Sequence, residues 1–278
     1  MSDVSEGKVR MTKDKIPCII DAHTHLGLES FIVRPIPKEK LKRPAFQDRM
    51  ELRVEDLVDR MDRNDVAQAV AFPFPLEEID ADAGNRYVLE AAKAHPDRII
   101  PFALIEEEIE PWLAFGARGF KQHAGLQSPE RFDLTTAYRT MAEAGVPLII
   151  HLQGAIHGTH PIDQVKAILR VAPTLKVIVA HMARAVPNTG TGVEETALGL
   201  RDHRNVYLET STVRDSETIA WTASIIGAER IIYGSDAPFN SHAEADPMAT
   251  EINVIRRAGL NQEMMEGICG RNLRRCLA

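Results

Sequence analysis

Near its start the chain reads Ile19-Ile20-Asp21-Ala22-His23-Thr24-His25-Leu26-Gly27, an apolar segment that ends in two histidines. Side chains alternate between the two faces of a β-strand, so His23 and His25 point the same way, about 6.6 Å apart along the backbone. That spacing suits two imidazoles that bind one metal ion. With ten histidines in 278 residues, an H-x-H triplet can arise by chance. Its meaning therefore depends on its place in the fold and on its partners.

Short β-branched runs alternate with longer amphipathic segments along the chain, which predicts repeated βα units around a parallel sheet. Their starts fall about thirty residues apart, close to the spacing in a (β/α)8 barrel of roughly 250 residues. The alternative is an open doubly wound sheet, but its G-x-G-x-x-G turn is absent. We therefore predict an α/β fold, a (β/α)8 TIM barrel. Strands are expected at 18–22, 67–72, 99–104, 119–121, 147–150, 176–180, 206–209 and 230–233, and helices at 54–63, 85–94, 107–115, 132–144, 162–171, 194–202 and 216–226.

The domain organisation predicted from this pattern is simple. Residues 1–15 are a polar N-terminal tail, and residues 16–278 form one catalytic barrel. A long loop after the first strand, residues 28–51, is rich in proline and arginine, and loops of that length in a compact domain are usually functional. Residues 247–278 are expected to form two helices that close the last βα unit and cap the barrel.

Composition narrows the class of protein. Forty acidic against thirty-three basic residues give a formal charge of -7, and aromatic residues are few, which disfavours nucleic-acid binding. The sequence holds neither a membrane-length apolar stretch nor a signal-peptide core, so we expect a cytoplasmic protein with a small-molecule substrate, either a monomer or a homo-oligomer. Cys18, Cys269 and Cys276 lack C-x-x-C spacing, which argues against a disulfide framework. Cys18, in the first strand, is expected to be buried.

Polar residues follow nearly every expected strand. Catalytic side chains of such a barrel project from the carboxyl ends of its strands, so these residues are candidates for one site. From His23 to His151 is 128 residues, four units of about 32, and from His151 to His181 is 30, one further unit. The candidates are His23 and His25 after strand one, Lys121 and His123 after strand four, His151 after strand five, His181 after strand six, Glu209 after strand seven and Asp236 after strand eight.

At residues 16–278 the chain resembles the amidohydrolase superfamily, in particular its single-domain, metal-dependent barrel hydrolases and decarboxylases. The resemblance rests on the H-x-H after strand one, on the histidines after strands five and six, and on G-S-D-A-P at residues 234–238. It implies that His23, His25, His151 and Asp236 bind a single divalent metal. It also implies that His181 is a neighbouring catalytic histidine.

Three neutral imidazoles and one carboxylate suit Zn²⁺ best, with Mn²⁺, Fe²⁺ or Co²⁺ as alternatives, and leave a position for water. Such a metal lowers the pKa of its water to about 7. Asp236 would then accept the water proton and pass it to the leaving group, and His181 would polarise the substrate carbonyl or stabilise the oxyanion. The alternatives are buried histidines bonded to barrel carbonyls, Asp236 as a turn residue, and His181 as a fifth ligand.

Other residues leave alternatives open. Lys121 could be carboxylated and bridge two metals, as in binuclear relatives, or it could bind substrate or extend to the barrel rim. The K-x-H form resembles the mononuclear branch and would place His123 along the pocket. Glu209 would orient a ligand histidine or form a structural salt bridge. His157 and His160 are expected in a substrate loop or in solvent.

Several arginines fall on the expected catalytic face. A carboxylate-bearing substrate would explain them, since arginine binds carboxylates in a bidentate manner. Solvated loop charge is the alternative for each. The arginines are Arg34, Arg43, Arg49, Arg184 and Arg214, and an apolar wall is expected from Phe72, Phe74 and Phe239.

Three functions are compatible with the sequence. The leading hypothesis is a metal-dependent hydrolase that acts on an amide, lactone or ester bond of a small carboxylated ring. The second is a non-oxidative decarboxylase that uses the same ligands, and the third is a non-catalytic barrel.

Overall fold

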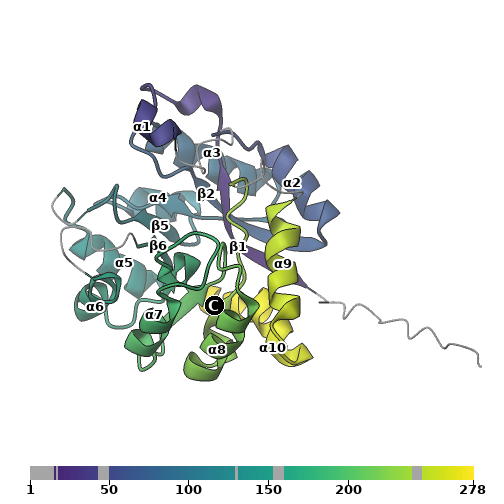
Figure 1. Cartoon of the computed structure of the whole chain (residues 1–278). Coiled ribbons are helices and arrows are strands. Elements are labelled where there is room, and N and C mark those ends of the chain that lie inside the picture. The colour runs from purple at the N-terminus through teal and green to yellow at the C-terminus, as the bar shows by residue number, and fades with distance from the viewer. Residues whose placement is uncertain (1–15, 17, 43–49, 129–130, 153–159, 240–245) are drawn as a thin grey trace, which may run out of the picture.

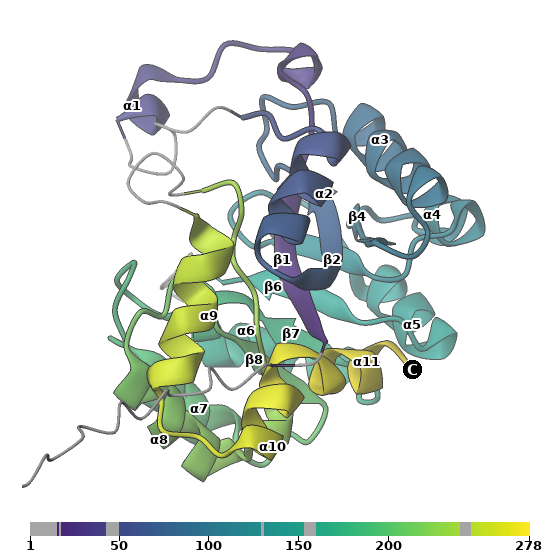
Figure 2. The ribbon, with the colours of Figure 1, turned by 90° about the vertical axis from the view of Figure 1, so that its right-hand side faces the viewer.

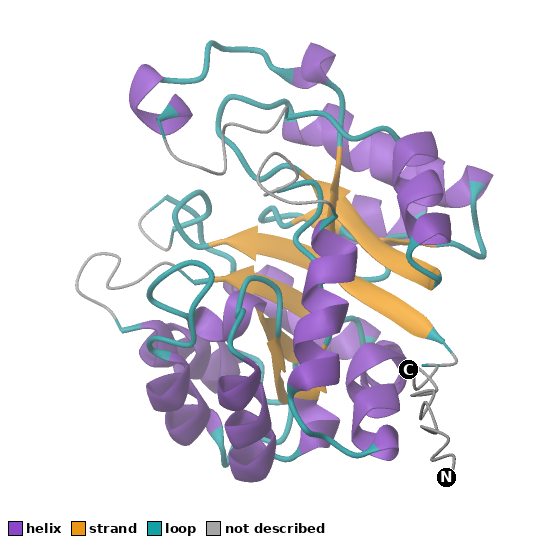
Figure 3. Ribbon diagram, turned by 45° about the vertical axis from the view of Figure 1, so that its right-hand side comes forward, coloured by secondary structure: helices purple, strands orange, loops and turns teal. Residues whose placement is uncertain are grey.

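The computed structural model describes residues 16, 18–42, 50–128, 131–152, 160–239 and 246–278. Its strands are all parallel and pair in two sheets, ordered β1-β2-β3 and β4-β5-β6-β7-β8-β9. They lie at the centre of the molecule, with helices around them (Figure 3). The strands are β1 Ile19–Leu26, β2 Val66–Pro73, β3 Ile99–Pro101, β4 Ala103–Leu104, β5 Phe120–His123, β6 Leu148–His151, β7 Val177–Val179, β8 Val206–Glu209 and β9 Ile231–Ile232.

The expected third strand, 99–104, is divided in two. Phe102 separates β3 from β4, and its N–H donates to the carbonyl of Ala71 in β2 at 2.9 Å. β3 pairs with β2 and β4 pairs with β5, so this one stretch of chain joins the two sheets. The break was not predicted because the sequence there is uniformly apolar, apart from Pro101, and contains no turn signal.

Backbone hydrogen bonds also join β1 to the chain at and after β9. The N–H of Ala22 donates to Tyr233 O at 3.0 Å, and the N–H of His25 donates to Ala237 O at 2.8 Å. With one strand divided, the nine strands make the eight βα units that the sequence predicts. The fold is a TIM barrel, and its carboxyl end brings residues from β1 and from the segment after β9 side by side.

The helices cover the outside of the strands in the order α2 to α8 (Figure 1). α2 and α8 occupy the predicted residues. α3 begins earlier than predicted because Asp80 caps it, its side chain accepting from Ala83 N–H. Their bounds are α2 Val54–Arg63, α3 Ala81–Ala94, α4 Glu110–Phe115, α5 Thr135–Ala144, α6 Pro161–Val171, α7 Val193–Leu200 and α8 Ser216–Ile226, with short 3₁₀ turns η3 Ala180–Ala183 and η4 Ala228–Arg230.

The C-terminal residues form two helical runs, as predicted. The first is α9 Pro247–Arg257, and the second joins α10 Gln262–Glu266, the π-turn η5 Gly267–Arg271 and α11 Asn272–Leu277. The second run covers the end of the barrel where β1 begins (Figure 2). A Cβ on Gly270 would lie 2.4 Å from the backbone oxygen of Cys18, so only glycine permits this close approach.

The long loop after β1 contains two short helices, η1 Glu29–Phe31 and α1 Lys38–Leu41, and stands beyond the end toward which β1 runs (Figure 2). It is tied to the chain after β2, because Val33 N–H donates to Glu78 O at 2.9 Å and Lys40 Nζ lies 2.8 Å from Glu78 Oε1. Residues 43–49 of this loop and the predicted tail 1–15 lie outside the described residues.

Apolar side chains fill the barrel as well as the space between strands and helices. The interior cluster includes Val70 and Phe72 of β2 and Phe102, between β3 and β4, and is closed by Leu273 and Cys276 of α11. Cys18 corrects one expectation, because it precedes β1 and is only half-buried, with Sγ 3.0 Å from Arg274 Nη2. All three cysteines are unpaired, in line with the sequence. None of the described helices has the length and apolar character needed to span a membrane.

Candidate metal centre

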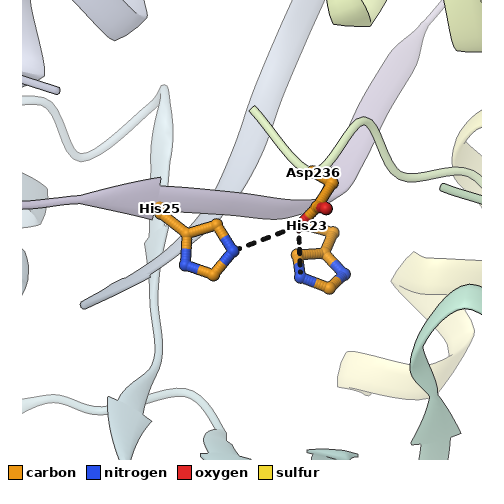
Figure 4. A group of neighbouring side chains, drawn as sticks. All are labelled: His23, His25 and Asp236. Atoms are coloured by element: carbon orange, nitrogen blue, oxygen red, sulfur yellow. Dashed lines mark hydrogen bonds and ion pairs between the residues drawn. The ribbon is translucent and has the colours of Figure 1, made fainter. Parts of the chain in front are cut away.

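His23, His25 and Asp236 meet at the carboxyl end of the barrel (Figure 4). The two histidines project from β1, and Asp236 approaches from the segment after β9. Asp236 Oδ1 lies 3.2 Å from Nε2 of both His23 and His25. The N–H of Asp236 donates to His23 O at 2.9 Å, which fixes the two segments against each other. Their ligand atoms all lie within 4.8 Å of one another, a geometry that suits one divalent ion.

The protonation states of these three residues also fit a metal. Burial lowers the pKa of His23 and of His25, so both imidazoles are neutral at pH 7. Burial raises the pKa of Asp236, but His181 and the hydrogen bond from His25 outweigh it and leave the pKa below its ordinary value. Neutral imidazoles and an ionised carboxylate are the forms that bind metals. The three residues therefore offer the donor atoms that a divalent metal requires.

Three phenylalanines surround His25 and form the predicted apolar wall. Their ring centroids lie 4.9 Å from that of His25 for Phe72, 5.4 Å for Phe74 and 4.9 Å for Phe239. Phe72 also contacts His23, with centroids 5.0 Å apart. This wall excludes water from one side of the centre and strengthens its electrostatic interactions.

Two buried acids hold His23 in place. Glu209 Oε2 lies 2.8 Å from His23 Nδ1, as expected for an acid that orients a ligand histidine. Asp21 Oδ1 accepts from the backbone N–H of His23 at 2.9 Å and of Ser235 at 3.0 Å. Burial raises the pKa of Asp21 to about 7. The sequence analysis did not identify Asp21, although the period of two places it on the same strand face as His23 and His25.

His181 enters the site through a left-handed turn. His181, Met182 and Ala183 have φ values of 57°, 49° and 52°, although none is glycine. Such a conformation costs roughly 1–2 kcal/mol per residue and persists only where surrounding contacts impose it. His181 Nδ1 lies 2.8 Å from Ser211 Oγ and 3.1 Å from Ser211 O, and burial lowers the pKa of the imidazole to about 3.

His151 lies beside His181 and not within the group of three. Its Nδ1 is 3.1 Å from His181 Nε2, and its ring stacks on His123 with centroids 4.5 Å apart. Within the described part of the chain, the sets of three ligand atoms that lie close together combine His23 with His25 and Asp236, or with His181 and Glu209. The structure therefore places His151 at the edge of the centre, and its role as a ligand stays a prediction.

Lys121 lies inside the site and does not extend to the rim. Its side chain is almost fully buried, and Nζ lies 3.2 Å from His23 Nε2 and 4.7 Å from the centroid of the Phe72 ring. Burial lowers its pKa to about 8, against the opposing charges of Asp236 and Glu209. His123, two residues further on, is half-buried, and the loss of solvent around its ring lowers its pKa to about 3.

The predicted arginines differ in position. Arg184 is half-buried, and its Nε donates to Thr212 O at 3.0 Å and to Thr212 Oγ1 at 2.8 Å. Its charge lowers the pKa values of His151 and His181, which places it beside both. Arg214 is paired with buried Glu251 at 3.0 Å. Arg34 is exposed and donates to the backbone oxygen of Glu77.

The remaining predicted residues lie elsewhere. His160 caps α6 and lies 3.2 Å from Glu195 Oε1 at the surface, as expected for a solvent-exposed histidine. Arg43, Arg49 and His157 lie outside the described residues. Sequence reasoning also missed Ser211 and Thr212, the partners of His181 and Arg184. Ser211 and Thr212 could have been identified from the sequence because they closely follow a barrel strand that ends in an acidic residue.

Comparisons with known proteins show the family and the fold of the chain. A family model described as amidohydrolase matches residues 20–277. No curated protein sequence matches the chain. Solved structures with the same fold include a protein described as a probable 2-pyrone-4,6-dicarboxylic acid hydrolase from Acinetobacter baumannii with citric acid bound. It is 15% identical, with a TM-score of 0.71, and the match covers 93% of this chain and 98% of the other.

Two decarboxylases share the fold as well. A 5-carboxyvanillate decarboxylase from Sphingomonas paucimobilis is 15% identical, with a TM-score of 0.69 over 93% of this chain and 98% of the other. A 5-carboxyvanillate decarboxylase from Novosphingobium aromaticivorans, complexed with manganese and a nitrobenzoic acid, is 16% identical. Its TM-score is 0.68 over 94% of this chain and 96% of the other.

Proposed function

Because the chain belongs to the amidohydrolase family, we propose that it hydrolyses an amide, lactone or ester bond of a small carboxylate-bearing molecule. The observation that carries the proposal is the position of Asp236. Its carboxylate lies 3.2 Å from Nε2 of both histidines of the H-x-H motif, where it can bind the ion and accept a proton from water.

We assign His23, His25, Asp236 and His151 as the residues that hold the ion. Zn²⁺ suits this donor set best, and Mn²⁺, Fe²⁺ and Co²⁺ are the alternatives, Mn²⁺ being the metal in one protein of the same fold. When bound, such an ion supplies Lewis acidity that polarises a substrate oxygen and makes water a stronger nucleophile. Asp236 receives the proton of the attacking water and returns it to the leaving group. His181, held by Ser211 through Nδ1, presents Nε2 beside the ion and acts as an acid–base group there.

Arg184 is the residue that we propose binds the substrate carboxylate. Its Nε and one terminal nitrogen are fixed on Thr212, which orients the guanidinium beside His151 and His181. Lys121 and His123 lie beside the same centre and would contact the substrate ring. Arg34 is the weaker candidate, since its contact in the structure is Glu77. Replacing Arg184 with Met should raise KM for a carboxylated substrate by about tenfold or more.

Decarboxylation is the second candidate function. Lys121 favours it, because a buried amine with a pKa of about 8 is protonated at pH 7 and could protonate a carbanion. The shared fold with two decarboxylases is compatible with this chemistry.

One experiment separates the two reactions. The metal-loaded protein is screened against lactones, amides and carboxylated aromatics in water enriched in ¹⁸O. Incorporation of ¹⁸O into an acid product supports hydrolysis, whereas release of CO₂ without incorporation contradicts it. Asp236→Asn should abolish turnover in either case. A protein that binds no divalent metal, and turns over no substrate when metal is supplied, would be a non-catalytic barrel.

The protein's setting is part of the same proposal. We infer a cytoplasmic location, for which the unpaired cysteines and acidic net charge are the support.

A further inference from the structure

Glu209, the last residue of β8, contacts both halves of the site. Its Oε2 lies 2.8 Å from His23 Nδ1, and it accepts from the backbone N–H of His181 at 3.1 Å and from Ser211 Oγ at 2.9 Å. Its Oε1 accepts from the backbone N–H of Ser211. One fully buried carboxylate therefore touches a ligand histidine and anchors the turn that carries His181.

The surroundings leave little freedom for this carboxylate. A Cβ on Gly234 would lie 2.3 Å from Glu209 Oε1 and 2.8 Å from His23 Cβ. The glycine of the G-S-D segment is thus required for Glu209 and His23 to share the space under the metal centre. Three parts of the chain therefore define the position of Glu209: β8, the turn that carries His181, and the segment at Gly234.

Hydrogen bonds to Glu209 define the proton on His23. The backbone N–H groups of His181 and Ser211 can only donate, so both oxygens of Glu209 are used as acceptors. His23 Nδ1 faces the same Oε2 and donates to the carboxylate. The lone pair of His23 is then on Nε2, which points toward Asp236.

A second branch defines the protons on His181 and His151. His181 Nδ1 lies 3.1 Å from the carbonyl oxygen of Ser211, which can only accept, so Nδ1 carries the proton and Nε2 the lone pair. Ser211 Oγ gives its own proton to Glu209 and accepts from His181 Nδ1 at 2.8 Å. His151 Nδ1, 3.1 Å from His181 Nε2, must then donate, which leaves Nε2 of His151 free to bind a metal.

We propose that Glu209 is a positioning residue that sets the tautomers of His23 and His181 and, through His181, of His151. A single buried carboxylate would thus prepare the nitrogens that bind metal and the nitrogen that faces the substrate. The inference rests on the proposed metal site and goes beyond it, because it assigns one residue to the control of both functions.

The test compares Glu209→Gln, Glu209→Asp and a matched control, Thr210→Val. Thr210 is the buried neighbour of Glu209, and its hydroxyl has no hydrogen-bond partner among the described residues. The readouts are Zn²⁺ affinity, from competition with a chromophoric chelator, and the ¹⁵N shifts of the histidine rings. Histidine ¹⁵N shifts distinguish the two tautomers, and His25, which does not contact Glu209, serves as the internal reference.

Glu209→Gln should weaken Zn²⁺ binding about 10- to 100-fold and give mixed tautomers at His23 and His181. Glu209→Asp should recover part of the affinity, because it restores the charge, and Thr210→Val should match the wild type. Affinity within threefold of wild type and unchanged tautomers in Glu209→Gln would overturn the proposal. So would an equal loss in Thr210→Val.

Two features keep the test decisive. If Glu209→Gln does not fold, Glu209→Asp carries it, because its shorter side chain cannot make every contact of Glu209 and should lower the Zn²⁺ affinity and give some tautomer mixing. Wild-type affinity together with unchanged ¹⁵N shifts at His23 and His181 in that variant would contradict the proposal. None of the readouts uses a substrate, so a failure to find hydrolysis leaves them intact. The His181 tautomer is also read in metal-free protein at pH 9, where Glu209 is ionised although burial raises its pKa to about 8. This readout separates the inference from a failure of metal binding.

Discussion

Lys121 places an amine where a metal would have to bind, because Nζ lies 3.2 Å from His23 Nε2. A protonated ammonium at that distance repels a divalent cation. Lys121→Met should therefore bind Zn²⁺ at least about tenfold more tightly than wild type at pH 7, a gain of about 1.4 kcal/mol. Since the pKa of Lys121 is about 8, wild-type affinity should rise as the pH passes from 7 to 9, and that of Lys121→Met should rise less.

The measurement is chelator competition at both pH values, with exposed Lys93→Met as the control. The opposite result, loss of metal in Lys121→Met, would show that Lys121 belongs to the ligand set, as a carboxylated lysine would.

His151 and His181 should separate by role even though their rings touch. His151→Ala removes a proposed ligand and should lower the metal content of the purified protein. His181→Asn should retain most of the metal and lower kcat by about 10²–10⁴-fold, as for the loss of an acid-base or oxyanion-stabilising group. Metal analysis and steady-state kinetics on the same preparations check this. Equal loss of metal in both variants would contradict the division.

At the scale of elements, the turn between α2 and β2 offers a test of backbone strain. Asp65 is exposed and has a φ of 56°, which glycine adopts without cost. Asp65→Gly should raise the free energy of unfolding by about 0.5–1 kcal/mol. Asp65→Ala, which keeps a Cβ in the same conformation, should not. The measurement is the free energy of unfolding of the wild type and the two variants by chemical denaturation. Equal stability of the Gly and Ala variants would show that the turn is unstrained.

Regular elements of this fold could be predicted from sequence because their signals are local. The apolar runs at 177–179 and 206–208 and the amphipathic period of α2 each indicate their structure without tertiary information. The left-handed turn at His181, Met182 and Ala183 could not be predicted. Its residues prefer right-handed backbone, and the contacts that impose it come from Glu209 and Ser211, about thirty residues later.

The same distinction applies to the site. His23, His25 and Asp236 could be predicted to meet, because strand ends of a barrel gather at one face. The side-chain orientation of His151 could not be predicted, because it depends on which ring nitrogen of His181 is available to accept a hydrogen bond. Asp21 was not identified because it belongs to no known motif. The only indication of its place in the site was the alternation of side chains along its strand.

At the scale of the whole molecule, five neutral histidines gathered at the carboxyl end of the barrel make acid sensitivity a property of the fold. Burial lowers their pKa values, so each contributes stability that is present above its unfolded pKa near 6.5 and is lost as the pH falls through the folded value. These residues are His23, His25, His123, His151 and His181.

Three buried carboxyls oppose this effect between pH 7 and about pH 4. Burial raises the pKa of Asp21 to about 7, that of Glu251 to about 7 and that of Glu209 above its ordinary value. Their contributions are present below their unfolded pKa values and are lost as the pH rises through the folded ones. Because the histidines outnumber the carboxyls, unfolding takes up protons on balance between pH 6.5 and 4.5.

The metal-free protein should therefore lose stability as the pH falls from 6.5 to 4.5. Below about pH 4 the carboxyls are protonated in both states, and the slope should steepen by about 1.4 kcal/mol per unit for each histidine that stays neutral in the folded state. For a typical total stability of about 5–15 kcal/mol, this loss should be enough to unfold the protein in acid. Urea titrations across this range, with a chelator present, measure the slope. His123→Asn should reduce it by about 1.4 kcal/mol per unit, since one fewer proton is taken up. A slope near zero in the wild type would mean that the imidazoles are not held neutral by burial.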